Sequence, residues 1–289
     1  MNNFIKKVAE NVTGLLPETE VETKEVKKNN NVTLNGIIIK KPGESVSPAF
    51  YVESYLENGL TDAREIAVKI TEEYRKHEKQ QSVLQNVGKM IDDFSQIKPY
   101  LRIRLVSRKL NEDALKNMPF IPFLDMAIIP VAAIPVKDGT GSVKINDSLL
   151  RKWGHSLEEL LPVMNENTFR TPYKLVNMKQ MLGDMVGDCS FGLPPEMYVL
   201  TNEENSFGAT QICNPATMQE IADRLDSNLL VIPSSVHEVL IVPVKPDEEK
   251  EMTSQLTSII REVNETQVSP EETLSDHPYI FTKDKGWKY

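Results

Sequence analysis

Two short apolar runs near the C-terminal end of the chain give its clearest pattern. Residues 229–232 and 239–242 contain no polar side chain, and the mostly polar residues 233–238 join them. Apolar, β-branched runs of this length are typical of buried strands. The pattern predicts a core β-hairpin over residues 229–243, with both faces covered because neither run alternates with polar residues.

Helices are predicted on both sides of this hairpin. Asn214 can cap the helix that precedes it, with a proline at the first helical position. The apolar residues of that helix recur at helical spacing: Met218, Ile221, Ala222 and Leu225. A longer amphipathic helix follows the hairpin with Asp247 as its expected cap, and residues 279–282 are expected to form a final strand.

The first part of the chain is predicted to contain a helix, a hairpin and a second helix. Apolar residues on one face indicate an amphipathic helix over residues 4–15. Two strands are expected at residues 18–28 and 32–40, joined at Asn29–Asn31, because asparagine tolerates the positive φ angles of a tight turn. Thr61 is expected to cap the next helix.

A domain boundary is expected before the middle of the chain. Residues 75–81 are almost wholly polar, and the pattern after them stays weak, so we place the boundary near Ser95. Residues 1–95 are then an N-terminal α/β unit, and residues 96–289 are a C-terminal domain that contains the core hairpin. The alternation of hairpins and helices predicts an α+β fold with antiparallel sheets covered by helices.

Weaker patterns occur elsewhere in the C-terminal domain. The apolar residues 123–136 include two prolines, which confines them to a sheet edge or to two short strands. Residues 197–201 and 207–213 are expected to be strands joined by a turn. Residues 172–195 lose their periodicity, which indicates an irregular segment. Pro162 is expected to kink the helix before this segment or to end it early.

Residues 100–106 alternate strictly between apolar and polar positions, as a half-exposed strand does. The apolar positions are expected to face the core: Leu101, Ile103 and Leu105. Arg102 and Arg104 are expected to face solvent. A phosphate-binding strip is the alternative, and the acidic character of the chain disfavours it.

Composition limits the partners and the compartment. The 289 residues carry a net charge of −9, which argues against a general affinity for nucleic acid or anionic membrane. No apolar run approaches the length of about 18 residues that a membrane span requires. Two cysteines are too few for a disulfide framework, so we expect a cytoplasmic protein with reduced thiols.

Four ionisable residues are the candidates for chemistry. His237 and Glu238 lie in the turn of the core hairpin, and Asp276 and His277 precede the final strand. Folding of the C-terminal tail over the hairpin would join two histidines and two carboxylates, a set that suits zinc or another divalent metal, with His237 and His277 as ligands. The alternative is that these residues satisfy backbone groups in tight turns.

Other motifs for catalysis or cofactor binding are absent from the sequence. No second histidine follows His237 at the spacing of a zinc protease, and no phosphate-binding loop or dinucleotide fingerprint occurs. Ser234 and Ser235 lack the glycine-flanked elbow of a serine hydrolase, so they are expected to be turn residues. Cys189 and Cys213 lack a second pair for a zinc knuckle, and Cys213 is expected to be a buried thiol.

Several short motifs resemble a known family. They are Asn35-Gly36, residues 46–48, residues 232–239, residues 263–266 and residues 274–277. Together the chain resembles domain-of-unknown-function family fifty-six-eighty-eight, which is common in clostridial genomes and mobile elements. Its C-terminal half is distantly similar to a second uncharacterised bacterial family. The resemblance implies a fold and a bacterial or mobile-element origin, and it brings no established activity.

Three functions remain open at this point. The favoured hypothesis is a non-catalytic cytoplasmic protein that binds another protein in a mobile-element or phage-related system. The first alternative is a metal-dependent or acid/base hydrolase centred on His237, Glu238, Asp276 and His277. The second is an acidic nucleic-acid mimic, although the 42 acidic residues are dispersed along the chain. No cofactor is expected except the divalent metal of the hydrolase hypothesis.

Overall fold

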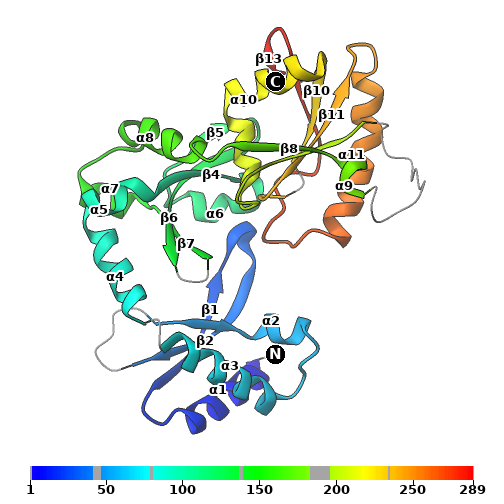
Figure 1. Ribbon diagram of the computed structural model, residues 1–289. Coiled ribbons are helices and arrows are strands. Elements are labelled where there is room, and N and C mark those ends of the chain that lie inside the picture. The colour runs from blue at the N-terminus through cyan, green and yellow to red at the C-terminus, as the bar shows by residue number, and fades with distance from the viewer. Residues whose placement is uncertain are drawn as a thin grey trace. The chain divides into compact units, whose positions relative to one another are not determined.

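The protein has an α+β fold built from antiparallel sheets and helices (Figure 1). The computed structural model describes residues 2–41, 47–78, 81–136, 139–182, 196–233 and 235–288. Contacts within the chain separate two compact units, residues 1–99 with 133–142 and residues 100–132 with 143–289. Independent folding of the N-terminal unit with a boundary near Ser95 stays a prediction.

The N-terminal unit contains a three-stranded antiparallel sheet in the order β1-β2-β3. The predicted hairpin is confirmed, since Glu20 pairs with Lys40 and the chain turns through Asn30 and Asn31 at φ angles of 58° and 56°. The helix that begins at Ala63 is capped by Asp62 and not, as was expected, by Thr61. The Asp62 carboxylate accepts backbone N–H groups of the first helical turn. The elements are α1 (Asn2–Leu15), β1 (Glu20–Lys27), β2 (Thr33–Lys40), β3 (Ala49–Tyr51), α2 (Val52–Glu57), α3 (Ala63–Glu78), α4 (Gln81–Asp92) and α5 (Phe94–Ile97).

The C-terminal unit is organised around a six-stranded antiparallel sheet in the order β13-β12-β10-β11-β9-β8. The core hairpin is confirmed as β10 and β11 at its centre, with Leu230 opposite Val242 and Val231 opposite Ile241. The strands are β8 (Tyr173–Asn177), β9 (Tyr198–Asn202), β10 (Asn228–Ile232), β11 (Val239–Val244), β12 (Tyr279–Thr282) and β13 (Gly286–Trp287).

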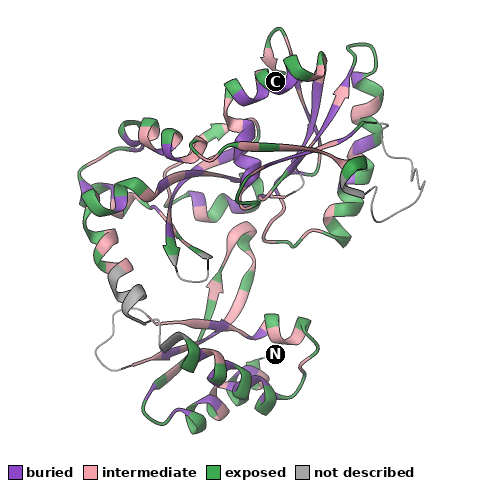
Figure 2. Cartoon of the chain, in the orientation of Figure 1, coloured by how far each residue is buried: buried purple, intermediate pink, exposed green. Residues whose placement is uncertain are grey.

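A helix covers each face of this hairpin, which explains why its strands lack polar alternation. Helix α10 (Pro215–Leu225) packs with Leu229 and Val231 on one face. Helix α11 (Glu249–Thr266) packs with Leu230 and Ile232 on the other. Successive residues of a strand point to opposite faces, so both sets are buried (Figure 2).

A second sheet has four strands in the order β4-β6-β5, with β7 also paired to β6; its residues 133–142 are grouped with the N-terminal unit. Its strands are β4 (Leu101–Ser107), β5 (Ile121–Phe123), β6 (Met126–Val136) and β7 (Gly139–Lys144). The expected edge position of the proline-containing run is wrong, because β6 has neighbours on both sides. Pro130 lies opposite Ile103 of β4. The N–H of Ile103 donates to Thr168 rather than to β6, so this pair of residues exchanges no backbone hydrogen bond. The missing N–H of Pro130 therefore costs no bond to β4.

Side-chain hydroxyl groups cover the free edge of β4. The N–H of Ile103 donates to Thr168 Oγ1 at 3.0 Å, and the N–H of Leu105 donates to Thr210 Oγ1 at 3.3 Å. An uncovered edge strand offers such groups to other chains. Thr168 belongs to the helix α8 (Leu157–Phe169) and Thr210 to the 3-10 helix η4 (Gly208–Cys213). These two helices therefore cover the free edge of β4, the strand that contains Arg104.

The expected strand at residues 207–213 is wrong, because these residues form η4. The chain enters it through Phe207 at a positive φ of 53°, a left-handed conformation that no strand contains. Gly208 follows in a tight space. A Cβ atom there would lie 2.3 Å from Thr201 Oγ1 and 2.7 Å from the carbonyl oxygen of His237.

Three expectations for the helices and loops need correction. Helix α8 continues past Pro162 to Phe169, since the carbonyl group left unbonded belongs to the exposed Glu158 and can bond water. Helix α11 is capped at Glu248 rather than Asp247. Residues 172–195 begin with β8 and α9 (Met178–Leu182) instead of an irregular segment, and Cys189 lies outside the described residues.

Three shorter helical segments complete the C-terminal unit: η3 (Lys109–Asn111), α6 (Glu112–Leu115) and α7 (Asp147–Trp153). Asn146 caps α7, and Ser156 with Glu159 forms the capping box of α8. The 3-10 helix η1 (Asn29–Asn31) belongs to the N-terminal unit, and η2 (Lys98–Tyr100) lies where the chain passes from the first unit to the second.

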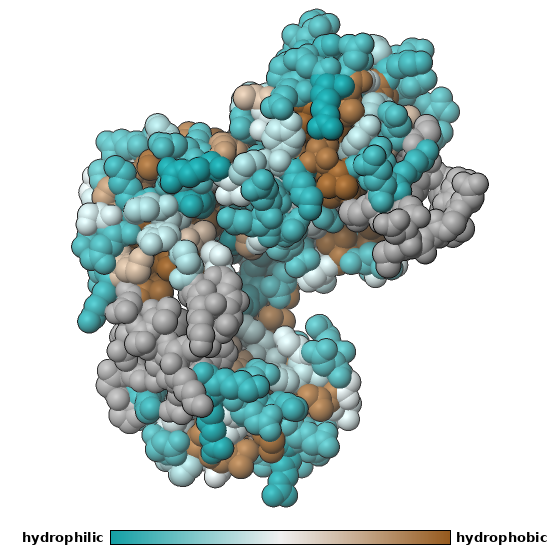
Figure 3. Space-filling model, viewed as in Figure 1, coloured by the Kyte–Doolittle hydropathy of each residue, from teal (hydrophilic) through white to brown (hydrophobic). Residues whose placement is uncertain are grey.

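Hydrophilic side chains cover most of the molecular face in Figure 3, with apolar atoms visible between them. Ile259 and Val263 of α11 are among the few large apolar side chains with more than a third of their surface exposed. Of the helices that the structure describes, none combines the length and the apolar character needed to cross a membrane.

Candidate functional site

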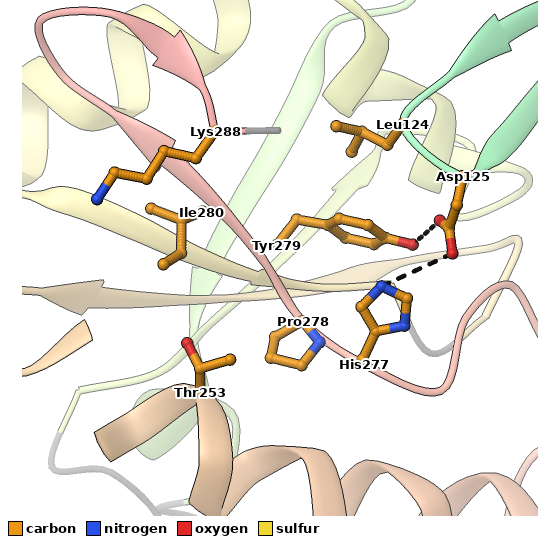
Figure 4. A pocket seen from close by; sticks show the side chains of 8 residues that line it. All are labelled: Leu124, Asp125, Thr253, His277, Pro278, Tyr279, Ile280 and Lys288. Atoms are coloured by element: carbon orange, nitrogen blue, oxygen red, sulfur yellow. Dashed lines mark hydrogen bonds and ion pairs between the residues drawn. The ribbon is translucent and has the colours of Figure 1, made fainter. Parts of the chain in front are cut away.

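An open pocket of about 390 Å³ lies in the C-terminal unit beside the start of β12 (Figure 4). The turn between β5 and β6 contributes Asp125, helix α11 contributes Thr253, and Lys288 follows β13. The complete lining is Leu124, Asp125, Thr253, His277, Pro278, Tyr279, Ile280 and Lys288. Pockets of this kind, with apolar walls and a few convergent polar groups, are the usual binding sites of proteins.

Local geometry directs Asp125 into the pocket. Leu124 adopts a positive φ of 55°, which lets the chain reverse tightly between β5 and β6. Phe123 packs edge-on against the ring of Trp287, with ring centroids 5.6 Å apart. This contact holds the turn against the C-terminal hairpin formed by β12 and β13, so Asp125 reaches the side chains of β12.

Tyr279 connects the polar groups at this end of the pocket. Its hydroxyl donates to Asp125 Oδ1 and also lies 2.9 Å from Ser275 Oγ. Burial of the phenol raises the pKa of Tyr279, and the hydrogen bond to the Asp125 carboxylate raises it further. The hydroxyl is therefore held as a neutral donor.

His277 lies between two carboxylates. Its Nε2 is 3.6 Å from Asp125 Oδ2, and its Nδ1 is 3.1 Å from Asp276 Oδ1. Nδ1 is also 3.2 Å from the hydroxyl oxygen of Ser275. The hydrogen bond with His277 is the main reason that the pKa of Asp276 is lowered. A histidine in this position can exchange protons with a group bound in the pocket.

The opposite end of the pocket carries an ion pair between an exposed lysine and a buried carboxylate. Lys288 Nζ contacts Glu249 Oε2, and Glu249 is only 6% exposed. Asn228 Nδ2 donates to the other oxygen of the same carboxylate at 2.8 Å. Figure 4 places Lys288 at the far end of the pocket from Asp125, so the two polar ends are separated by apolar side chains.

The structure places the hairpin turn next to the C-terminal tail. The N–H of Val236 donates to the carbonyl oxygen of Glu272 at 2.8 Å, and the N–H of Ser275 donates to that of Pro233 at 3.2 Å. Ser235 pairs with Thr273 in an isolated β-bridge. The tail therefore folds over the core hairpin.

The two candidate histidines nevertheless have different partners. His237 Nε2 lies 3.4 Å from Glu272 Oε1, and its Nδ1 accepts the N–H of Phe207 at 3.2 Å. Asp125 and Asp276 are the carboxylates beside His277. Among the described residues, none of these three ion pairs involves Glu238, which is exposed.

Ser235 acts as a turn residue. Its hydroxyl oxygen accepts the backbone N–H groups of His237 at 3.1 Å and Glu238 at 3.3 Å. This confirms the structural role expected for it. Ser234 lies outside the described residues.

The described part of the chain contains no group of three or more His, Cys, Asp or Glu side chains that could hold a metal ion. Cys213 packs against the core, and its burial raises the pKa of the thiol.

Sequence reasoning missed four polar residues of the pocket, namely Asp125, Thr253, Tyr279 and Lys288. Asp125 does carry a signal, since it is the only charged residue between Lys116 and Lys137. A lone carboxylate within an apolar stretch usually has a specific partner.

A family model matches residues 1–283 of the chain, and its description is "Family of unknown function (DUF5688)". The chain belongs to this family. The match confirms the resemblance drawn from the short motifs and includes every polar residue of the pocket except Lys288. Comparisons with curated proteins and with solved structures find no match for this member of the family.

Proposed function

We propose that this chain is a non-catalytic binding protein and that the pocket beside β12 receives a side chain of a protein partner. The observation that carries this proposal is that the polar groups of the pocket bind one another. Tyr279 and His277 both contact Asp125, and Lys288 contacts Glu249. Paired groups around an apolar floor favour recognition over chemistry, which needs an activated group free to react.

Charge indicates the kind of partner. Asp125 and Asp276 flank His277 at one end of the pocket, and the whole chain carries a net charge of −9. Apolar walls and an acidic end suit a partner segment in which an apolar side chain lies beside a basic one. The negative field of the chain would also speed the approach of a basic partner.

Two threonines of α11 provide a matched test. Thr253 lines the pocket, whereas Thr257 lies one turn further along, outside it; both are half-buried and donate to a backbone carbonyl four residues earlier. Arginine is favourable in helices, so Thr253→Arg should fill the pocket without unfolding α11. Immobilised wild type and Thr257→Arg are expected to capture the same partner from a cell lysate, and Thr253→Arg is expected to lose it. Equal capture by the two variants would show that the pocket is not the recognition site.

One observation favours a second candidate, an acid/base hydrolase. His277 faces the pocket with a carboxylate at each ring nitrogen, the arrangement of a general acid or base. Wild type and His277→Gln would be compared on ester, phosphoester and peptide substrates. Turnover that His277→Gln abolishes supports the hydrolase, and equal rates near background leave the binding proposal as the better account.

We also propose that the protein works in the cytoplasm of a bacterial cell, within a mobile-element or phage-related system. The chain belongs to the DUF5688 family, and the mobile-element setting comes from the resemblance of its short motifs. Cys213 is a free thiol, which suits a reducing compartment. Fractionation of producing cells, with detection of the chain in the cytoplasmic fraction, tests the location.

A further inference from the structure

Arg104 is a charged residue of the C-terminal unit that the pocket beside β12 leaves unexplained. It was expected to face solvent, but its guanidinium lies 3.2 Å from the centroid of the Phe207 ring. Among the residues that the structure describes, no acceptor or carboxylate contacts this guanidinium, and its Nε is buried without a hydrogen-bond partner. The other two guanidinium nitrogens are not fully buried, unlike Nε.

An unpaired cation in this position lowers the stability of the fold. Burial lowers the pKa of Arg104 to about 10, and no neighbouring charge contributes to the shift. A buried ion without a partner is unfavourable, and a cation–π contact with an aromatic ring offsets only part of that cost. A guanidinium with two nitrogens that are not fully buried therefore favours an anionic ligand as its missing partner.

The turn beside Arg104 is built to hold the Phe207 ring in place. Phe207 adopts its positive φ of 53°, which is unfavourable for a bulky residue. Its N–H donates to His237 Nδ1, and the two rings lie 4.9 Å apart. Gly208 then fits where any side chain would collide with Thr201. Strained backbone of this kind is often found at binding sites.

We propose that Arg104, supported by the ring of Phe207, is a recognition site for a carboxylate that its two terminal nitrogens bind side by side. A planar guanidinium matches the two oxygens of a carboxylate. One isolated cation balances a monoanion, whereas a phosphate dianion usually needs several basic groups. The site is independent of the pocket beside β12, since neither Arg104 nor Phe207 lines that pocket.

The test uses arginine labelled with ¹³C and ¹⁵N and N-acetylglycine as the carboxylate, at constant ionic strength. The guanidinium signal of Arg104, identified by its absence from Arg104→Lys, is expected to shift and saturate. N-acetylglycinamide, which lacks the charge, is expected to leave the signal in place. Arg102→Lys is the matched control on the same strand, and it should keep the full response of Arg104.

Two results would overturn the carboxylate site. The first is a shift that does not saturate or that all arginines share equally. The second is tighter binding of inorganic phosphate than of N-acetylglycine at the same ionic strength. Phe207→Leu retains the cation and removes the ring, so it keeps the test valid even if Arg104→Lys does not fold. It is expected to weaken N-acetylglycine binding about two- to fivefold, from the strength of a cation–π contact, and unchanged binding would contradict the role of the ring.

Discussion

The hydroxyl group of Tyr279 donates a hydrogen bond to the carboxylate of Asp125, a residue 154 positions earlier in the chain. Tyr279 belongs to the six-stranded sheet, and Asp125 lies in the turn between β5 and β6 of the four-stranded sheet. The bond therefore joins the two sheets of the C-terminal unit. The acidic end of the pocket forms only when these sheets pack together.

Loss of this bond should destabilise the C-terminal unit. Tyr279→Phe removes the hydroxyl group that donates to Asp125 and contacts Ser275 Oγ, so the free energy of unfolding should fall by about 1–3 kcal/mol. Urea denaturation of the two proteins measures the difference. Tyr198→Phe is the control, because the Tyr198 hydroxyl makes no hydrogen bond within the part of the chain that the structure describes. A loss as large as that of Tyr279→Phe would argue against the specific role of the bond.

The His277 side chain should control the titration of Asp276. The hydrogen bond from His277 lowers the pKa of Asp276, so His277→Gln is expected to raise that pKa towards its ordinary value of about 3.9. A carboxyl group with a lowered pKa in the folded state stabilises the fold above its unfolded-state pKa, and this stabilisation is lost as the pH falls through the folded-state pKa. Carboxyl ¹³C signals followed from pH 2 to 6, about the range in which Asp titrates, measure the change. An identical Asp276 titration in both proteins would contradict the proposed hydrogen bond.

Gly208 should tolerate no side chain. Gly208→Ala places a Cβ atom 2.3 Å from Thr201 Oγ1, so we expect a loss of about 1–3 kcal/mol in the free energy of unfolding. Gly14→Ala is the control, because nothing lies within 4 Å of the new atom and alanine favours the helix α1. Thermal denaturation should show a lower midpoint for the first variant and an unchanged or higher one for the second. The reverse order would contradict the close packing around η4.

Cys213 should react slowly in the folded protein. Burial raises the pKa of its thiol, so the reactive thiolate is rare near neutral pH. In a Cys189→Ser background Cys213 is the one remaining cysteine, and reaction with an aromatic disulfide reagent reports on it alone. The rate at pH 8 is expected to be at least about tenfold lower than in denaturant, in line with a shift of one pKa unit or more. Equal rates would show that the thiol is exposed.

Elements defined by local patterns could be predicted from the sequence. The hairpin of β10 and β11 follows from two apolar runs, and the caps Asn146 and Ser156 follow from residue types at fixed spacing. The helix η4 could not be predicted, because its residues are buried on all sides, as those of a central strand are. Its entry through Phe207 at positive φ has no sequence signal in a residue other than glycine or asparagine.

The residues of the candidate site also include some that could be predicted from the sequence and others that could not. Asp276 and His277 were found because they are ionisable residues beside an apolar strand, and they do lie at the pocket or next to it. Asp125 was missed because its partners come from a strand that is distant in the sequence. His237 was paired with the wrong group for the same reason, since Glu272 lies beside it only after the tail folds over the hairpin.

The claim that the pocket beside β12 receives a protein partner is tested most directly by photo-crosslinking. A benzophenone amino acid placed at position 253 lies at the pocket, and the same amino acid at position 257 lies one helical turn outside it. Irradiation in producing cells should join a partner protein to the chain with the label at position 253 and much less with the label at position 257. The crosslinked peptide of the partner should contain an apolar residue next to a basic one. Equal crosslinking at the two positions, or none at position 253, would contradict the account.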